Sequence, residues 1–486
     1  MGSAPLNRSA ARADTSPFLA LDRRASEPSV NRQATNQSLT STLRFLITPN
    51  VANHYDQRMV EGLAKALRAH NHAALALPSP MSELVASTLC KQLDIDVLIQ
   101  INRFRPTYDP LPAKVRHIGW FQDIFPASFD PGQSDFHDGD IVYTLGDTSV
   151  LGLNAALPCH VGTLLTGVDE SSLSSQSSGY EKRPDFSLCG YIPPPPMIGG
   201  NPRQDLLWYI HDTLKRVPLV GQSLPMRVLW RILFRRFEAA GYAPFAIANA
   251  ARNTVEALYR PLNGDLDSQA LAAAIRKIIA PVLIPAKRHS RPKHSSRTRL
   301  GFIMAPYHGT ALGQQPEIHG LIDHFAHEYP RLLDRCRLVR CALSVSSNVE
   351  LYGDGWQNHP EFRPYHCGFI TVQKALYDIY RRSRLNLANN THGLGLHSRT
   401  LECMAVGGFV FTHASPNDQK AGGIETSFEQ GIHYGVYTSE TFADDTQYWL
   451  SNDTARMQAG ARAAEVVRDR HLWRHRAAQI LADLKR

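Results

Sequence analysis

The fold is decided by the stretch Leu385-Asn386-Leu387-Ala388-Asn389-Asn390-Thr391-His392-Gly393-Leu394-Gly395-Leu396-His397-Ser398-Arg399-Thr400-Leu401-Glu402-Cys403-Met404-Ala405-Val406. It begins as a short apolar strand, continues as a glycine-rich loop and ends as a helix closed by Gly407-Gly408. Such a loop binds anions, because free backbone N–H groups and the helix dipole favour phosphate at a helix N-terminus. Arg399 adds a planar two-pronged donor, and Glu402 lies one turn further on, where it can accept hydrogen bonds from a ribose. The stretch therefore predicts a pocket for a nucleoside diphosphate.

Two shorter motifs precede this stretch, and each follows an apolar run. The first is Tyr352-Gly353-Asp354-Gly355-Trp356 and the second is Gly368-Phe369-Ile370. A hairpin-like turn whose Trp packs in the core is the alternative interpretation of the first motif. A strand from Phe409 to Thr412 follows the predicted helix, so the region alternates strands and helices as an α/β sheet does.

Together these motifs resemble the C-terminal half of GT-B fold glycosyltransferases, specifically the CgeB-like branch of the group 1 transferases. That branch has a Tyr-Gly-x-Gly-Trp segment, a Gly-x-Ile/Val turn, a Leu-Asn strand and an Arg-Thr-x-Glu-x-x-Ala-x-Gly-Gly helix. Asp185 to Tyr191 is similar to the segment that starts the family's second domain. The resemblance implies two Rossmann-like doubly wound α/β domains facing a cleft. It also implies a nucleotide-diphosphate sugar as donor, with neither a cofactor nor a metal.

The resemblance also assigns roles to residues of the second domain. Arg399, the loop amides from Gly393 through Gly395 to Ser398, and His397 would supply a positive field that stabilises the departing diphosphate. Glu402 would hold the ribose, and the backbone at Phe369 and Ile370 would read the base. Three side chains would face the sugar: Asn389, Asn390 and His392. Gly353 and Gly355 would belong to the donor site, and a surface salt bridge is the alternative for Arg399 and Glu402.

One departure from the family pattern concerns stereochemistry. Many retaining GT-B enzymes carry a Glu-x7-Glu pair, and the first member would fall at Leu394 if Glu402 is the second. The usual carboxylate contact to the donor sugar is therefore absent or made by other groups. Retention and inversion both stay open.

The first domain is expected at residues 41–184. A strand from Leu43 to Ile47, an amphipathic helix from Asp56 to Ala69 and later strands alternate with helices, which predicts a parallel sheet. Ligands bind at the carboxyl ends of such strands. Asp123 follows the strand that ends at Trp120 and is the candidate general base for the acceptor hydroxyl, with a helix cap or turn as its alternative role. Three residues of the first strand's exit loop are candidate acceptor contacts, although such residues are also common in turns: Asn50, Asn53 and His54.

The remaining segments are expected as follows. Residues 1–40 lack apolar periodicity and are expected to be disordered, and residues 185–299 to hold a helical insertion and a basic linker. A second Rossmann-like domain is expected at 300–470 and a C-terminal helix at 471–486, which in GT-B folds crosses back to brace the first domain. The sequence leaves open whether the second domain starts at Phe186 or at Leu300. Val339 to Leu343 is predicted as one of its strands.

Composition restricts the class of protein. The chain of 486 residues is 43% hydrophobic and 20% charged, as in a soluble globular protein with a sizeable core. No apolar run approaches the roughly 18 residues of a membrane span, and the N-terminus lacks an apolar signal core, so a cytoplasmic location is expected. Seven scattered cysteines predict reduced thiols. The net charge of +8 fits anionic substrates, whereas no basic stripe interleaves with aromatics to indicate nucleic acid.

The basic amphipathic pattern around Leu229 to Phe237 permits a peripheral membrane contact, although core packing is the alternative. The acceptor and the oligomeric state stay unknown. Glycosyl transfer to a hydroxyl of a glycan, lipid, protein or small molecule is the expected reaction. The alternatives are a GT-B-like epimerase or phosphorylase, and a nucleotide-sugar or glycan binding protein without catalysis.

Overall fold

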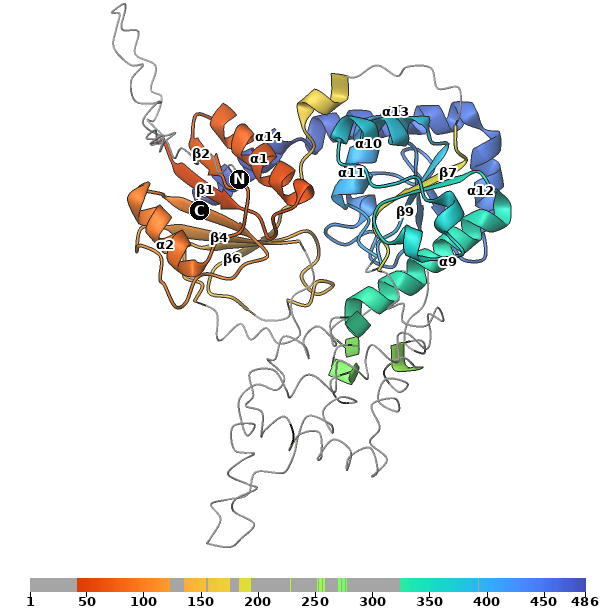
Figure 1. Cartoon of the computed structure of the whole chain (residues 1–486). Helices are drawn as coiled ribbons and strands as arrows, with labels where there is room; N and C mark the ends of the chain where they lie inside the picture. Colours follow the sequence, from red (N-terminus) through yellow and green to blue (C-terminus); the bar gives the residue numbers. More distant parts are fainter. Residues whose placement is uncertain are drawn as a thin grey trace, which may run out of the picture.

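The computed structural model describes residues 42–122, 135–153, 156–174, 183–193, 324–391 and 393–486, with a few helical positions between 228 and 277. They form two α/β domains, each built on its own parallel sheet (Figure 1). This confirms the predicted fold class of two Rossmann-like domains.

The first domain holds a six-stranded sheet in the order β2-β1-β3-β4-β5-β6. Every neighbouring pair is parallel. The strands are β1 (Arg44–Thr48), β2 (Ala73–Ala76), β3 (Val97–Ile101), β4 (Arg116–Phe121), β5 (Ile141–Thr144) and β6 (His160–Thr163). Helices α1 (His54–Ala69) and α2 (Glu83–Gln92) cover the sheet, and the faces of β1 and β3 are buried against them. The predicted strand–helix alternation is confirmed here.

The second domain holds a five-stranded parallel sheet in the order β11-β10-β9-β7-β8. Its strands are β7 (Phe186–Cys189), β8 (Val349–Tyr352), β9 (Leu385–Ala388), β10 (Val410–His413) and β11 (Gly435–Tyr437). Its helices are α9 (Tyr329–Val345), α10 (Gln373–Arg382), α11 (Ser398–Ala405), α12 (Phe442–Ser451) and α13 (Asp453–Arg470). An apolar cluster forms the core of this domain and includes Phe186 of β7 and Leu385 of β9. Among the helical positions described between 228 and 277, four are buried in this cluster: Ala251, Val255, Leu271 and Ile275.

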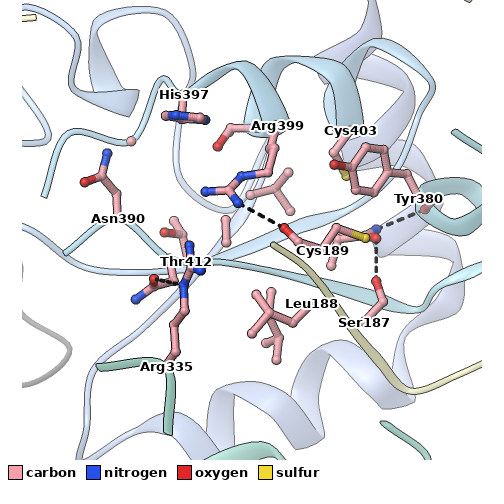
Figure 2. A pocket seen from close by; sticks show the side chains of 17 residues that line it. Ser187, Leu188, Cys189, Arg335, Tyr380, Asn390, His397, Arg399, Cys403 and Thr412 are labelled. Carbon is pink, nitrogen blue, oxygen red and sulfur yellow. Dashed lines mark hydrogen bonds between the residues drawn. The ribbon is translucent and has the colours of Figure 1, made fainter. Parts of the chain in front are cut away.

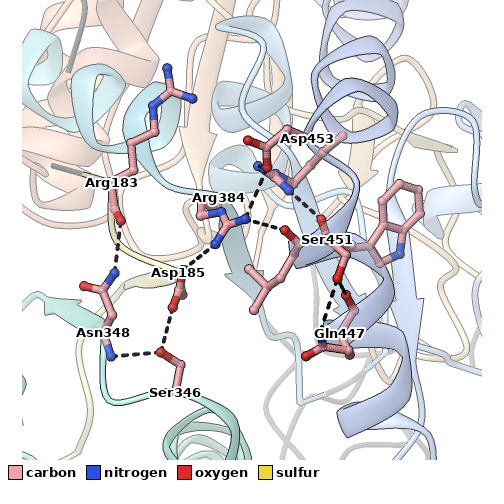
Figure 3. A network of polar contacts seen from close by, with 11 residues as sticks. Arg183, Asp185, Ser346, Asn348, Arg384, Gln447, Ser451 and Asp453 are labelled. Atoms are coloured by element: carbon pink, nitrogen blue, oxygen red, sulfur yellow. Dashed lines mark hydrogen bonds and ion pairs between the residues drawn. The ribbon is translucent and has the colours of Figure 1, made fainter. Parts of the chain in front are cut away.

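Strand β7 lies between β9 and β8, although almost 160 residues separate it from β8 in the chain. A polar network ties its first end to its neighbours (Figure 3). Arg384 Nη1 donates to Asp185 at 2.9 Å, and Ser346 Oγ donates to the same carboxylate at 2.7 Å. Asn348 Nδ2 donates to the Arg183 carbonyl at 3.0 Å. The segment from Arg183 is thus a structural part of the second sheet.

The prediction of a strand at Val339–Leu343 is wrong. These residues belong to α9, where Leu338, Val339 and Ala342 are buried as one apolar face. The apolar run resembles a strand because periodicity does not distinguish a buried strand from a buried helix segment when the run is this short. Consequently the arginines of this segment lie on a helix.

The last helix, α14 (Trp473–Asp483), leaves the second domain and packs on α1 of the first. The return is fixed by two backbone hydrogen bonds: Val168 N donates to His471 O at 2.9 Å, and Trp473 N donates to Val168 O at 3.2 Å. The chain therefore crosses from the second domain back to the first at its C-terminal helix.

Several predictions lie outside the described residues. They concern residues 1–40, Asp123, most of the helical insertion with its basic linker, the region from 300 to 323, and His392. Within the described ranges, no helix has both the length and the apolar character that crossing a bilayer requires.

Candidate active site

Three cavities described here are lined by residues of both domains, and the largest of these three has a volume of about 820 Å³. The first domain lines it with the loop and helix start from Asn50 to Arg58, at the carboxyl end of β1. The second domain contributes residues 369–373, His397 and Arg399. This cavity therefore brings together seven of the predicted site residues: Asn50, Asn53, His54, Phe369, Ile370, His397 and Arg399.

A second cavity of about 370 Å³ shares part of its wall with the first. Both cavities are lined by Gln122, Arg331, Arg335, His397 and Arg399. The second adds Asn389 and Asn390 of the exit loop after β9. The shared residues thus form a partition between two compartments of one cleft, where a substrate could be bound on either side.

Arg399 lies in the first turn of α11 and enters the cleft beside the end of β7. Its Nη1 donates to the Cys189 carbonyl at 3.3 Å. Figure 2 shows Arg399 and Arg335 entering one pocket from α11 and α9. His397 occupies the N-cap position of α11 without a side-chain cap, so the first N–H groups of the helix are left for another acceptor. The end of α11 is therefore suited to an anion.

Part of the predicted amide nest is already occupied. Gly393 N donates to Asn390 O at 2.9 Å, Leu396 N to Gly422 O at 3.0 Å, and His397 N to Gly395 O at 3.0 Å. These three amides are not free for a ligand. The positive field at this end of the sheet consequently rests on the first turn of α11 and on arginine side chains.

Arg335 is the residue that sequence reasoning missed. Its side chain is only 4% exposed, and its Nη1 has no hydrogen-bond partner among the described residues. Its guanidinium lies 5.1 Å from the ring centre of Tyr191, and its Nε is 3.5 Å from Asn389 Oδ1. Burial, and then the charges of Arg399 and Arg331, lower the pKa of Arg335. A buried cation among other cations is expected where an anion binds.

A signal for Arg335 does exist in the sequence. Arg331 and Arg335 are four residues apart and so share one face of a helix. The mistaken strand at Val339–Leu343 concealed that spacing. In the structure, Arg331 is paired with Glu328 and contacts the hydroxyl of Tyr191, which leaves Arg335 and Arg399 as the less neutralised cations.

His397 supplies a polar group instead of a positive charge. Burial, followed by the charges of Arg399 and Arg335, lowers its pKa to about 3. The imidazole is therefore neutral at pH 7, and its Nδ1 lies 3.1 Å from Ser398 Oγ. It can donate or accept a hydrogen bond at the partition, whereas the expected contribution to the positive field falls to the arginines.

Glu402 faces a separate cavity of about 210 Å³, together with Ser398, Tyr55 and Arg58. The residue is buried, with 8% of its surface exposed, and its Oε1 lies 3.7 Å from Arg58 Nη2 of the first domain. Burial raises the pKa of Glu402, and the charges of Arg58 and Arg399 oppose that rise. The carboxylate is thus between the domains: Tyr55 and Arg58 line both this cavity and the largest one, whereas Glu402 lines the smaller of the two.

The two asparagines after β9 hold the loop in place. Asn389 donates to Asp334 and Asn390 donates to the Leu394 carbonyl. His413 Nε2 lies 3.1 Å from the Asn390 carbonyl. Both side chains line the cleft, so they can position the loop and also border a ligand.

Gly353 and Gly355 have a steric role in the turn after β8. Their φ angles are +124° and +94°, a region that favours glycine. A Cβ at Gly355 would come within 1.9 Å of the Ile192 carbonyl oxygen. Trp356 is buried and donates to the Gly190 carbonyl at 2.7 Å. The turn therefore presses on the chain after β7, and neither glycine is among the residues that line the three cavities described above.

No group of three or more His, Cys, Asp or Glu side chains in the described part of the chain is arranged to hold a metal ion. The donors that converge on the cleft are guanidinium groups and helix amides, which suit an anionic ligand.

Comparison with known proteins gives one family match. Residues 331–482 match the family described as glycosyl transferase-like. This range covers β8 to β11 with their helices and most of α14. The chain thus contains a glycosyltransferase domain, which confirms the predicted enzyme class. A search of curated proteins found no match.

Several solved structures are similar over most of the chain at low identity. HepE from Anabaena, solved with UDP and glucose, has a TM-score of 0.42 at 12% identity and covers 91% of this chain and 99% of its own. Sucrose-phosphate synthase from Thermosynechococcus elongatus has a TM-score of 0.42 at 9% identity, with coverages of 90% and 98%. The spinosyn forosaminyltransferase SpnP has a TM-score of 0.36 at 9% identity, with coverages of 91% and 99%.

Proposed function

We propose that this glycosyltransferase moves a sugar from a nucleoside-diphosphate donor to an acceptor hydroxyl in the cleft between its domains. One observation carries the proposal: the guanidinium of Arg335 is buried beside Arg399 at the start of α11, and its Nη1 has no hydrogen-bond partner within the described part of the chain. A pyrophosphate would accept hydrogen bonds from both arginines and from the first amides of α11. These protein donors would stabilise the leaving group, the role that a divalent metal has in other enzymes.

The other residues of the site have proposed roles on either side of this centre. The nucleoside would extend toward Phe369 and Ile370, whose segment borders the largest cavity, and Glu402 would accept the ribose hydroxyls. Asn389, Asn390 and His392 would border the sugar. The acceptor would approach from the first domain, past Asn50, Asn53 and His54, with Asp123 as the general base.

Arg399 gives the most direct test. Arg399→Ala should lower kcat/KM for the sugar donor by a factor equivalent to about 2 to 4 kcal/mol of transition-state stabilisation. The reason is that a hydrogen-bond donor directed at the developing negative charge is lost. Arg399→Lys should recover part of that loss, since it keeps the charge and loses the two-pronged geometry. Arg340→Ala is the matched control, because Arg340 pairs with Glu361 on the exposed surface of the same domain. Wild-type kinetics in a folded Arg399→Ala variant would remove Arg399 from the mechanism.

A panel of nucleoside diphosphates and their sugars, measured by thermal shift, would identify the base and the sugar. The correct ligand should raise the melting temperature by mass action. UDP, GDP, ADP and CDP are the first compounds to compare. A chain that binds such a sugar but releases none of it to water would favour the alternative of a binding protein without catalysis.

Two finer assignments belong with this proposal. We infer the CgeB-like branch from the ordered motifs at Tyr352, Gly368, Leu385 and Arg399. We infer a cytoplasmic location, for which the seven free thiols are the supporting observation.

A further inference from the structure

A cation from the first domain meets the carboxylate that is proposed to hold the donor ribose. Arg58 lies in the first half of α1, and its Nη2 is 3.7 Å from Glu402 Oε1 in α11. Next to this pair, the hydroxyl of Tyr55 is hydrogen-bonded to the side chain of Ser398. The start of α1 therefore contacts the start of α11 through two polar pairs.

Burial opposes the ionisation of Glu402, and two neighbouring arginines, Arg58 and Arg399, favour it. The titratable or charged groups that face it are Arg58 and Tyr55 from α1, Arg399 and Cys403 from α11, Cys189 from β7 and Tyr380 from α10. Tyr and Cys are neutral at pH 7 and do not compensate a carboxylate. Arg399 is shared with the proposed diphosphate site, so Arg58 is the cation that remains for Glu402 when a donor is bound.

We propose that Arg58 is a positioning residue of the donor site, which reaches across the cleft to keep the Glu402 carboxylate ionised and directed for ribose binding. The inference rests on the proposed function, in which Glu402 accepts the ribose hydroxyls. Two hydroxyl donors need an ionised carboxylate, because its oxygens accept stronger, charge-assisted hydrogen bonds than a protonated acid does. Since Arg58 belongs to the other domain, ribose binding is strongest when the two domains are in contact.

The direction of the pH effect follows from the contacts. Burial raises the pKa of Glu402, and Arg58 is the stronger of the two charges that lower it. Without Arg58 the pKa of Glu402 rises further, so more of the carboxyl is protonated in weakly acidic solution. The loss of ribose binding should therefore be large at low pH and should diminish as the pH rises above the new pKa.

The experiment measures binding by calorimetry from pH 5.5 to 8.5 for wild type, Arg58→Ala, Arg58→Lys and Glu402→Gln. The probes are the nucleoside diphosphate selected from UDP, GDP, ADP and CDP, and inorganic pyrophosphate, which lacks the ribose. Relative to wild type, Arg58→Ala should weaken nucleotide binding about tenfold at pH 6, the effect of losing one hydrogen bond to a charged group, and about twofold or less at pH 8.5. Pyrophosphate binding should not change, and Arg58→Lys should restore most of the nucleotide affinity.

Lys65→Ala is the matched control. Lys65 lines the same 210 Å³ cavity from the same helix and carries the same charge, but it pairs with Asp169 at 3.4 Å. Its removal should leave nucleotide binding unchanged across the pH range. A loss as large as that of Arg58→Ala would show a general field effect and overturn the proposal.

Other outcomes separate this proposal from the one it rests on. If Arg58→Ala weakens nucleotide and pyrophosphate equally, or by a factor that does not depend on pH, Arg58 is not acting through Glu402. If the nucleotide binds more tightly to Arg58→Ala at every pH, Arg58 competes with the ribose, and the proposal is overturned. If Glu402→Gln binds the nucleotide like wild type, the proposed ribose contact fails, while the Arg399 test still decides the transferase mechanism.

Discussion

At the scale of one residue, Arg335 shows that a group suited to ligand binding can lower the stability of the core that holds it. A guanidinium that is almost fully buried, lacks one hydrogen-bond partner and lies near two other arginines destabilises the empty protein. Natural cores usually avoid such a group or pair it. Its presence is understandable if a bound anion compensates it.

The prediction is that Arg335→Met stabilises the free protein and weakens the donor complex. The free energy of unfolding should rise by roughly 1 to 3 kcal/mol, because a buried charge that Tyr191 and Asp334 compensate only in part is replaced by an apolar chain of similar length. Nucleoside-diphosphate binding should weaken by about 1.5 to 3 kcal/mol, the contribution of hydrogen bonds to a charged group. Denaturant unfolding and calorimetry measure the two quantities on the same preparation.

Arg382→Met is the matched control for this prediction. Arg382 is also on a helix of the second domain, but it pairs with Glu350 and contacts the hydroxyl of Tyr352. Its loss leaves Glu350 with the Tyr352 hydroxyl but without a cation, so the free energy of unfolding should fall by about 1 to 3 kcal/mol. If Arg335→Met is as destabilising as Arg382→Met, the protein itself compensates the Arg335 guanidinium, and the interpretation that a bound anion does so is wrong.

At the scale of elements, α1 shows that one loop can have two roles. The Asn53 side chain accepts a hydrogen bond from Asp56 N at 2.7 Å and caps the helix, and Asp56 accepts from the backbone N–H groups of Asn50 and Val51. The same loop lines the largest cavity. Capping therefore accounts for Asn53 as a structural residue. Because Asn53 also lines the cavity, it can in addition contact the acceptor.

Asn53→Ala should lower the free energy of unfolding by about 1 kcal/mol, because an uncapped donor remains at the start of α1. Ser82→Ala, at the N-cap of α2, should lower it less, since the Ser82 Oγ is 3.4 Å from Val85 N. Asn53→Ser keeps a capping oxygen and should retain most of the stability. A raised acceptor KM in that stable Ser variant would show that Asn53 also contacts the acceptor, and an unchanged KM would limit it to the cap.

Elements were predicted from the sequence where one strong periodic signal decided them. The buried apolar runs at β1, β3 and β9 and the amphipathic pattern of α1 led directly to parallel sheets. Helix α9 was missed at Val339–Leu343, because its buried face reads locally like a strand. The direction of a side chain could not be predicted from local patterns either. Which cavity Glu402 lines depends on its packing against Tyr55 and Arg58, which are over 300 residues away in the chain.

At the scale of the whole molecule, contacts at several places join the domains. Val168 pairs with the chain around Leu472 where the backbone crosses twice. Leu394 of the glycine-rich loop is buried with Phe121, Phe136 and other apolar residues of the first domain. Arg58 meets Glu402. The loop at the proposed donor site is thus held from both sides, so changes at the domain contact should reach the site.

Trp473 is the best place to test how the two domains share stability. It is 8% exposed, packs edge-on to Trp120 at 6.2 Å between ring centres, and closes the first-domain core although it follows the second domain in sequence. Trp473→Ala should lower the free energy of unfolding of the first domain by about 3 to 5 kcal/mol, the range for a large buried aromatic. Hydrogen exchange should then accelerate in β1 and α1 and stay slow in β9 and β10. Trp449→Ala removes a Trp whose ring centre lies 4.5 Å from that of Phe409 in the second domain, and it should give the opposite pattern. Equal acceleration in both domains for either variant would mean that they unfold as one cooperative unit and that α14 does not belong to the first domain alone.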